Sequence, residues 1–336
     1  MKSISPGHRR FVSTVLPVLS LAAFVPYAEA EILASPFVTD SAPAFNADYA
    51  AANVFDNTEF EYASAGQGVD TFFDFNFSVP QTFDKIVVIN RDSVGFSDWI
   101  GDFTLTFDGG PTTASVLRTP LRGYSEIHSL GGVFTATTVR LDVDTIGTGD
   151  AFNNTGAMEI FFVRTPTGQT PIVPTIFNSA TAFSPEYAAA GAIDGVVARS
   201  NEAGAPSRFE YASQSLGVDA FVDFDFGSVV PIGGFDFFDR IADEDRIYAF
   251  DLIFSQNDIF GDGDDVVKSY NPTGIGLGDE FAGVPARYIR FDVTDSNTAF
   301  GQNTGISEIS FYQIPEPSSL ALLGMGVLGL SIRRRR

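Results

Sequence analysis

Cysteine is absent from the 336 residues, and histidine and tryptophan are rare, with two and one. The lack of cysteine excludes disulfides and thiol nucleophiles. His128 is the only histidine between the two chain ends. The residues needed for a Ser–His catalytic pair or for a zinc site are therefore almost entirely missing. No Gly-rich phosphate loop stands between a strand and a helix. Paired carboxylates of a glycosidase stay possible because acids are abundant, but we expect no enzyme.

Positive charge is also scarce. Lys and Arg number 20 against 42 Asp and Glu, which gives a formal charge of −22. Several of the basic residues lie in the two end segments, so the stretch between them is more acidic still. Such a surface repels nucleic acid and anionic lipid and favours divalent cations. Solubility alone is the other explanation of this charge, and we expect no nucleic-acid partner.

The first 30 residues have the pattern of a secretory signal. Lys2, Arg9 and Arg10 precede an apolar run over 11–25, and Ala28 and Ala30 form a small-x-small cleavage site. A buried N-terminal helix would not explain why the charges, the apolar run and the cleavage site occur in this order. The sequence therefore predicts a signal peptide over 1–30 and export through the inner membrane.

The C-terminal segment 315–336 has three parts. The motif Pro315, Glu316 and Pro317 comes first, and an uncharged apolar stretch over 318–332 follows. That stretch is shorter than the ~20 residues that span a bilayer comfortably. The last part is a basic cluster, which favours retention on the cytoplasmic side. This cluster consists of Arg333, Arg334, Arg335 and Arg336.

In this order the three parts resemble the PEP-CTERM sorting signal of Gram-negative bacteria. The resemblance implies that a membrane-embedded exosortase cleaves near the motif. It also implies that the hydrophobic helix anchors the chain in the inner membrane, either transiently or lastingly. An ordinary C-terminal membrane anchor is the alternative.

An internal repeat organises the rest of the chain. Four blocks recur in the same order, at an offset of 138 residues for the first block and 149 or 150 for the others. The pairs are YAAANVFDN (49–57) with YAAAGAIDG (187–195), FEYASAGQGVDTFFDFNF (60–77) with FEYASQSLGVDAFVDFDF (209–226), VRLDV (139–143) with IRFDV (289–293), and NTGAMEIFF (154–162) with NTGISEISF (303–311). Each copy has the size of one domain. We therefore predict two modules, 31–164 and 175–314, joined by a Pro- and Thr-rich spacer over 165–174.

Within each copy, apolar and polar residues alternate with period two. In 221–227, Phe221, Asp223 and Asp225 fall on one face, while Val222, Phe224 and Phe226 fall on the other. Further predicted strands are 71–77, 85–90, 103–107, 137–143, 250–254 and 287–293. Turns such as 108–110 and 261–263 separate them. The pattern predicts an all-β fold of two tandem antiparallel β-sandwiches.

The order of blocks in the second copy carries a further resemblance. The blocks are AIDG (192–195), SRFE (207–210), FVDFDFG (221–227), FDLIFS (250–255), ARYIRFDV (286–293) and GISEISFY (305–312). This order resembles the discoidin or coagulation-factor type-C family, which implies a galactose-binding-like jelly roll. The family usually has Trp where Phe60 and Phe209 stand, and the first copy lacks the Ser/Thr-Arg pair.

Many members of that family hold one structural calcium ion. The matching carboxylates are Asp56 with Glu159 in the first copy and Asp194 with Glu308 in the second. Calcium takes six to eight oxygen ligands, which backbone carbonyls could complete. The alternative is that the aspartates form Asx turns and the glutamates lie on a solvated strand edge.

A ligand site is expected in the loops at one end of each sandwich, by analogy with the family. Trp99 could stack on a sugar ring, with Arg91 or Asp98 bonding to hydroxyl groups; the alternative is that Trp99 caps the core. The sequence favours a carbohydrate-binding protein of the cell envelope or extracellular polysaccharide matrix. The other hypothesis is a structural or adhesive surface protein without a glycan site.

Overall fold

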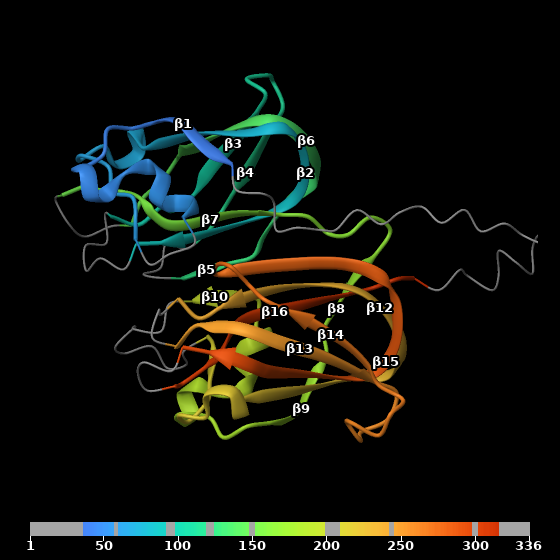
Figure 1. Ribbon diagram of the computed structural model, residues 1–336. Coiled ribbons are helices and arrows are strands. Elements are labelled where there is room, and N and C mark those ends of the chain that lie inside the picture. The colour runs from blue at the N-terminus through green and yellow to red at the C-terminus, as the bar shows by residue number, and fades with distance from the viewer. Residues whose placement is uncertain are drawn as a thin grey trace, which may run out of the picture.

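We describe the protein from a computed structural model, which contains two large β-sheets and one small two-stranded sheet (Figure 1). The residues that the structure describes are 36–56, 60–91, 98–118, 124–147, 152–198, 209–241, 245–297 and 302–315. The predicted signal peptide with Ala28 and Ala30, and the sorting tail from Glu316 onward, lie outside these ranges.

The first half of the chain builds a six-stranded antiparallel sheet in the order β1-β2-β6-β3-β4, with β7 also paired to β2. Its strands are β1 (Phe37–Ser41), β2 (Phe72–Asn90), β3 (Phe103–Phe107), β4 (Thr113–Val116), β6 (His128–Val143) and β7 (Ala157–Val163). β2 pairs first with β1 and later with β7, so one long strand serves both layers of the sandwich.

The sequence of β2 explains both its face and its bend. Phe73, Phe75 and Phe77 are buried, and the polar residues between them are partly exposed. The pairing of β2 with β6 is interrupted between Asn76 and Gln81, near a residue of positive φ at position 78. A bulge of this kind bends a strand and lets it turn a corner between layers.

The second half builds an eight-stranded antiparallel sheet in the order β11-β16-β12-β15-β13-β14, with β8 paired to β16 and β9 to β12. Its strands are β8 (Thr170–Ile172), β9 (Thr175–Ser179), β11 (Tyr211–Ala212), β12 (Phe221–Asp239), β13 (Ile247–Ser255), β14 (Val266–Tyr270), β15 (Gly276–Ser296) and β16 (Gly305–Gln313). The pairing of β12 with β15 is interrupted between Asp225 and Val230, where Gly227 has φ 76°.

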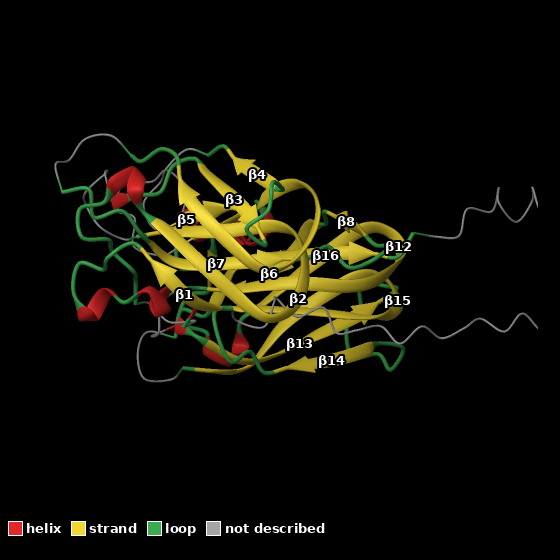
Figure 2. Ribbon diagram, turned by 90° about the horizontal axis from the view of Figure 1, so that it is seen from above, coloured by secondary structure: helices red, strands yellow, loops and turns green. Residues whose placement is uncertain are grey.

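The helices of the described residues are short 3-10 turns of three to five residues. They are η1 (Ala47–Tyr49), η2 (Ala51–Phe55), η3 (Gly68–Asp70), η5 (Pro185–Tyr187), η6 (Ala189–Ile193) and η7 (Gly217–Asp219). They gather at the same end of the molecule in both halves, as the two views agree (Figures 1 and 2). In the part of the chain described here, no helix has the length and apolar character to cross a membrane.

The all-β antiparallel prediction is confirmed, and the strands expected from period two lie in β2, β3, β6, β12, β13 and β15. One detail was wrong. Asp223, expected on a solvated face, is only 1% exposed. Arg290 of the neighbouring strand covers it, with Nε 2.7 Å from the carboxylate. Period two predicts the face of a strand, but it cannot show that a long arginine folds over that face.

Each half has an aromatic core of its own. In the first, Phe162 contacts the rings of Phe75, Phe77 and Phe83 at centroid distances of 5.0 to 5.3 Å. In the second, Phe250 packs on Phe291 at 4.4 Å. These inner faces account for much of the unusually high phenylalanine content.

A third apolar cluster joins the two halves. Val87, Ile89, Met158, Phe161 and Val163 of the first half pack with residues of the second. The partners from the second half are Val197, Phe238, Ile241 and Ile275. The small sheet also crosses the boundary, since β5 (Tyr124–Glu126) pairs with β10 (Val196–Ala198).

The segment 165–174, expected to be a spacer, lies partly against the second sandwich. β8 pairs with β16, and the buried Gln169 donates to the carbonyl of Gly233 at 3.1 Å. A Cβ at Gly233 would meet Gln169 and Ile314 at under 3 Å. A larger residue at position 233 would therefore displace the side chains of Gln169 and Ile314, which pack where the start and the end of this half cross.

Candidate functional site

The three residues predicted to contact a ligand in the first half are all buried. Trp99, Arg91 and Asp98 are exposed by 7%, 5% and 7%. The backbone of Trp99 bridges to Gly156, and its carbonyl accepts from Gly147. The structure brings the three together at the helix-bearing end, but inside the fold.

Arg91, directly after β2, is the centre of a polar network. Its Nη2 lies 2.7 Å from the carboxylate of Glu61, and its Nη1 lies 3.2 Å from Asp98. Nη1 also donates to the carbonyl of Asn154 at 2.7 Å. The guanidinium lies over the ring of Tyr49 at 5.3 Å. Two carboxylates and an aromatic face therefore surround one buried cation.

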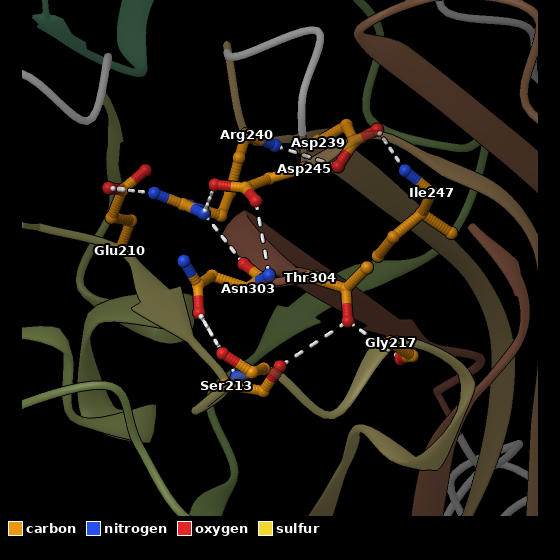
Figure 3. A network of polar contacts seen from close by, with 10 residues as sticks. Glu210, Ser213, Gly217, Asp239, Arg240, Asp245, Ile247, Asn303 and Thr304 are labelled. Carbon is orange, nitrogen blue, oxygen red and sulfur yellow. Dashed lines mark hydrogen bonds and ion pairs between the residues drawn. The ribbon is translucent and has the colours of Figure 1, made fainter. Parts of the chain in front are cut away.

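The second half repeats this network around Arg240 (Figure 3). The guanidinium pairs with Glu210 at 3.1 Å and with Asp245, and it donates to the carbonyl of Asn303 at 2.6 Å. It lies 5.6 Å from the ring of Tyr187. Glu210, Asn303 and Tyr187 match Glu61, Asn154 and Tyr49 in the repeat blocks. Arg240 and Asp245 take the places of Arg91 and Asp98 in the contacts of the network.

Burial and charge act in opposite directions on the groups of this network. Burial alone would lower the pKa of Arg240, but the carboxylates of Glu210 and Asp245 raise it. Burial raises the pKa of Asp239 to about 7, although Arg246 and two backbone N–H donors lower it in part. The cation is thus fixed by its partners and holds together segments far apart in the sequence.

The repeated Asn-Thr-Gly motif completes the network. The Asn303 side chain accepts from the backbone of Ser215, and the Thr304 hydroxyl donates to the carbonyl of Gly217 at 2.7 Å. A Cβ at Gly305 would collide with the carbonyl of Tyr211. The contacts of Asn303 and Thr304 and the close backbone approach at Gly305 thus explain why each of these residue types stands at its position in the motif.

The predicted metal-binding carboxylates of the second half lie close together. Gly195 N donates to Glu308 Oε2 at 3.0 Å, and Val196 N donates to Asp194 Oδ1 at 3.0 Å. Burial raises the pKa of Glu308 well above its usual range, and the charge of Asp194 adds to this rise. The charge of Asp194 thus disfavours ionisation of Glu308, and a divalent cation beside the two carboxyl groups would offset this effect.

In the first half the geometry is less complete. Glu159 is fully buried in β7, and Asp56 ends η2, which packs on β7 through Phe55 and Phe162. Among the described residues, no group of three or more His, Cys, Asp or Glu side chains could hold a metal ion. A calcium ion at either position would therefore need carbonyl oxygens to complete its shell.

Sequence reasoning missed the role of Glu61, Glu210 and Arg240. For the two glutamates a signal was present in the repeat, because FEYAS recurs in both copies, whereas Arg240 lies outside the repeated blocks. A buried Glu partner for an arginine about 30 residues later cannot be derived from such recurrence alone. Only the fold shows that these blocks meet.

A model of the PEP-CTERM protein-sorting motif matches residues 313–336. The chain carries a PEP-CTERM sorting motif. Such a motif indicates an exported, exosortase-processed and membrane-associated protein of Gram-negative bacteria. Of the PEP-CTERM residues, Pro315 is described in the structure, just after β16.

The second half of the chain matches another family model. Residues 174–312 fit a domain of unknown function, DUF7402. No curated protein matches the chain.

Solved structures similar to this chain include a lectin, a pair of CBM32 domains and an F5/8 type C domain. A fucolectin from striped bass (Morone saxatilis) serum is 15% identical, with 85% of this chain and 99% of that chain covered and a TM-score of 0.33. The CBM32-1 and CBM32-2 domains of Clostridium perfringens ZmpB are 12% identical, with 82% and 92% covered and a TM-score of 0.29. The F5/8 type C domain of a Bacteroides fragilis protein is 14% identical, with 44% and 97% covered and a TM-score of 0.33. At these TM-scores the fold rests on the strands described above.

Proposed function

We propose that the protein is a non-enzymatic carbohydrate-binding protein of the cell envelope or exopolysaccharide matrix. The observation that carries the proposal is a sorting motif for export joined to two repeated antiparallel β-sandwiches. The sequence resemblance to the discoidin family supports a glycan as the ligand. The final location, on the outer surface or in the matrix, belongs to the same proposal.

The environment of His128 supports binding over catalysis. Burial, together with the nearby charge of Arg118, lowers the pKa of His128 to about 4. An imidazole with such a pKa is a weak base at neutral pH. The only histidine between the chain ends thus makes a poor general base.

Retention on immobilised polysaccharides tests this function. The mature protein is passed over envelope polysaccharides, and sugar release is measured in the same samples. Retention without release is the expected result. Release abolished by one Asp or Glu substitution would instead make the protein a glycoside hydrolase. No retention on any polysaccharide would favour a structural or adhesive surface protein.

We also propose one structural calcium ion in each half, held by Asp194 with Glu308 and by Asp56 with Glu159. When bound, the ion would join the turn after η2 or η6 to the last strand of its half. An ion that binds only the folded state raises stability by ~2.7 kcal/mol at a hundredfold excess over Kd.

Thermal melting with calcium and with chelator tests the ion. The melting temperature of the wild type should rise with calcium, and Asp194→Asn with Glu308→Gln should reduce that rise. Asp262→Asn, in an exposed turn between β13 and β14, is the matched control. A melting temperature that does not change with calcium would contradict the proposed structural calcium ion.

A further inference from the structure

One exposed aromatic ring recurs at the same position of both halves. Phe45 is 55% exposed and Phe183 is 50% exposed, and they match in the repeat at the offset of 138. Large apolar side chains that stay in water add nothing to a core. The recurrence of such a ring at one place therefore points to a use at the surface.

Each exposed ring is held firmly. Phe45 N donates to the carbonyl of Ala63 at 2.7 Å, and Phe183 N donates to that of Ala212 at 2.8 Å. The residue before each phenylalanine forms a β-bridge, Ala44 with Ser64 and its counterpart in the second half. The loop that carries the ring is thus fixed to the sandwich.

A second ring supports each exposed one. Phe45 meets Tyr49 edge to face at 5.9 Å, and Phe183 meets Tyr187 at 5.7 Å. Behind each tyrosine lies the buried arginine of the network, at 5.3 and 5.6 Å. The chain from guanidinium to tyrosine to phenylalanine orders the ring before any ligand arrives, which reduces the entropy lost on binding.

The surroundings of the rings are polar. Asp48 lies one turn after Phe45, and Glu186 occupies the matching place after Phe183; both residues are exposed. An apolar ring beside a carboxylate suits a sugar, which offers a C–H face for the ring and hydroxyl groups for the acid. A formal charge of −22 disfavours an anionic partner.

The two rings belong to halves that pack against each other. They precede η1 and η5, which lie at the same end of the molecule (Figures 1 and 2). Phe161 packs on Phe238 across the boundary at 5.5 Å, and Arg164 pairs with Glu280 at 2.9 Å. Two equal sites at a fixed separation fit a ligand that repeats along its length.

We propose that Phe45 with Tyr49, and Phe183 with Tyr187, form two equivalent platforms on which sugar units of one uncharged polysaccharide chain stack. The inference rests on the proposed carbohydrate-binding function. It replaces Trp99, Arg91 and Asp98 by residues that a ligand can reach.

Binding of full-length mature protein to soluble galactan, glucan and mannan, and to their short oligosaccharides, tests the platforms. The wild type should bind one polymer at least tenfold more tightly than its short oligosaccharide. Phe45→Ala or Phe183→Ala should each remove most of this advantage, and the double variant should lose polymer binding. The controls are Val133→Ala and Leu117→Ala, which are 72% and 81% exposed. Both should bind as the wild type does.

The outcomes separate the two levels of the argument. If the wild type binds a polymer and the double variant, with an unchanged melting temperature, binds it equally well, the platforms are wrong and the function stands. Equal affinity of the wild type for polymer and oligosaccharide would overturn the bridging of both platforms by one chain. If the wild type binds none of the polysaccharides, the carbohydrate-binding function itself fails, and the platforms fail with it.

Discussion

Single side chains decide how this acidic protein buries charge. Arg91 and Arg240 each place a guanidinium among two carboxylates, a carbonyl and a tyrosine ring. Arg140 on the outside of the first sandwich also pairs with two acids, Asp74 and Asp142, but its side chain is 40% exposed. Buried and exposed arginines with similar partners can therefore be compared within one molecule.

Removal of the buried arginine should be far more costly than removal of the exposed one. Arg240→Ala leaves Glu210 and Asp245 without their cation in a dry site, so we expect a loss of about 3–5 kcal/mol in unfolding free energy. Arg140→Ala should lose less than about 1 kcal/mol. Denaturant unfolding measures both, and equal losses would contradict the assigned role of Arg240.

His128 should give the protein an acid-sensitive stability. Its Nε2 has no hydrogen-bond partner among the described residues, and burial lowers its pKa from 6.5 to about 4. Between these two pH values the unfolded chain binds a proton that the folded chain refuses, so stability falls as pH falls. The ring is only partly buried, so we expect about 2 kcal/mol rather than the full shift.

The measurement compares the wild type with His128→Leu at several pH values. Their difference in unfolding free energy should change between pH 6.5 and 4 and stay constant above and below. Carboxyl groups with raised pKa, such as Asp236 and Asp239, act with the opposite sign but are common to both proteins. A flat difference would show that His128 can be protonated in the folded state.

At the scale of elements, the start of β7 and of β16 is set by one close crossing. A Cβ at Gly156 would collide with the carbonyl of Tyr62, as one at Gly305 would with Tyr211. Gly156→Ala or Gly305→Ala should therefore cost about 2–4 kcal/mol, because the backbone of a neighbouring segment must move. Gly132→Ala is the control, since its nearest atoms lie at 3.7 Å. Thermal unfolding of the three variants measures these losses. A Gly305→Ala variant as stable as the wild type would contradict the close backbone crossing.

The elements also show how far sequence reasoning reaches. Alternation in 71–77 and 221–227 predicts β2 and β12 because a strand with one buried face needs that period. The same rule cannot foresee that one strand bends at Ser78 or Gly227 and joins both layers. Nor could it separate a ligand contact from a core residue at Trp99, since an indole serves either use.

The repeat in the sequence contained a clue to the two aromatic platforms that sequence reasoning did not use. Phe45 and Phe183 recur at the offset of 138, yet a recurring aromatic is usually a core residue. Only the exposed fraction shows that these two differ from Tyr62 and Tyr211, which recur just as well and are buried. Recurrence in both copies indicates that a residue is required, and its exposed fraction shows whether it serves the core or the surface.

For the whole molecule, the shared apolar cluster predicts that the two halves unfold together. Phe161 and Phe238 pack across the boundary, and a buried polar chain runs from Lys85 through the hydroxyl of Tyr312 to Asp236. Calorimetry of the wild type should give one transition. Phe161→Ala with Phe238→Ala should lower stability by several kcal/mol and split the melting curve in two. Val133→Ala should leave one transition, and two transitions in the wild type would contradict the coupling.

β16 also determines where the C-terminal end of the described chain lies relative to the short helices. The strand starts beside Asn303 of the arginine network and runs for 9 residues, or about 30 Å, to Gln313. Ile314 then donates its N–H to Pro231 and is wedged against Gly233 and Gly283, and the sorting motif follows at once. The described chain thus ends at the pole opposite its short helices (Figures 1 and 2). A protein held at a surface by this end would therefore present its helix-bearing pole away from the point of attachment.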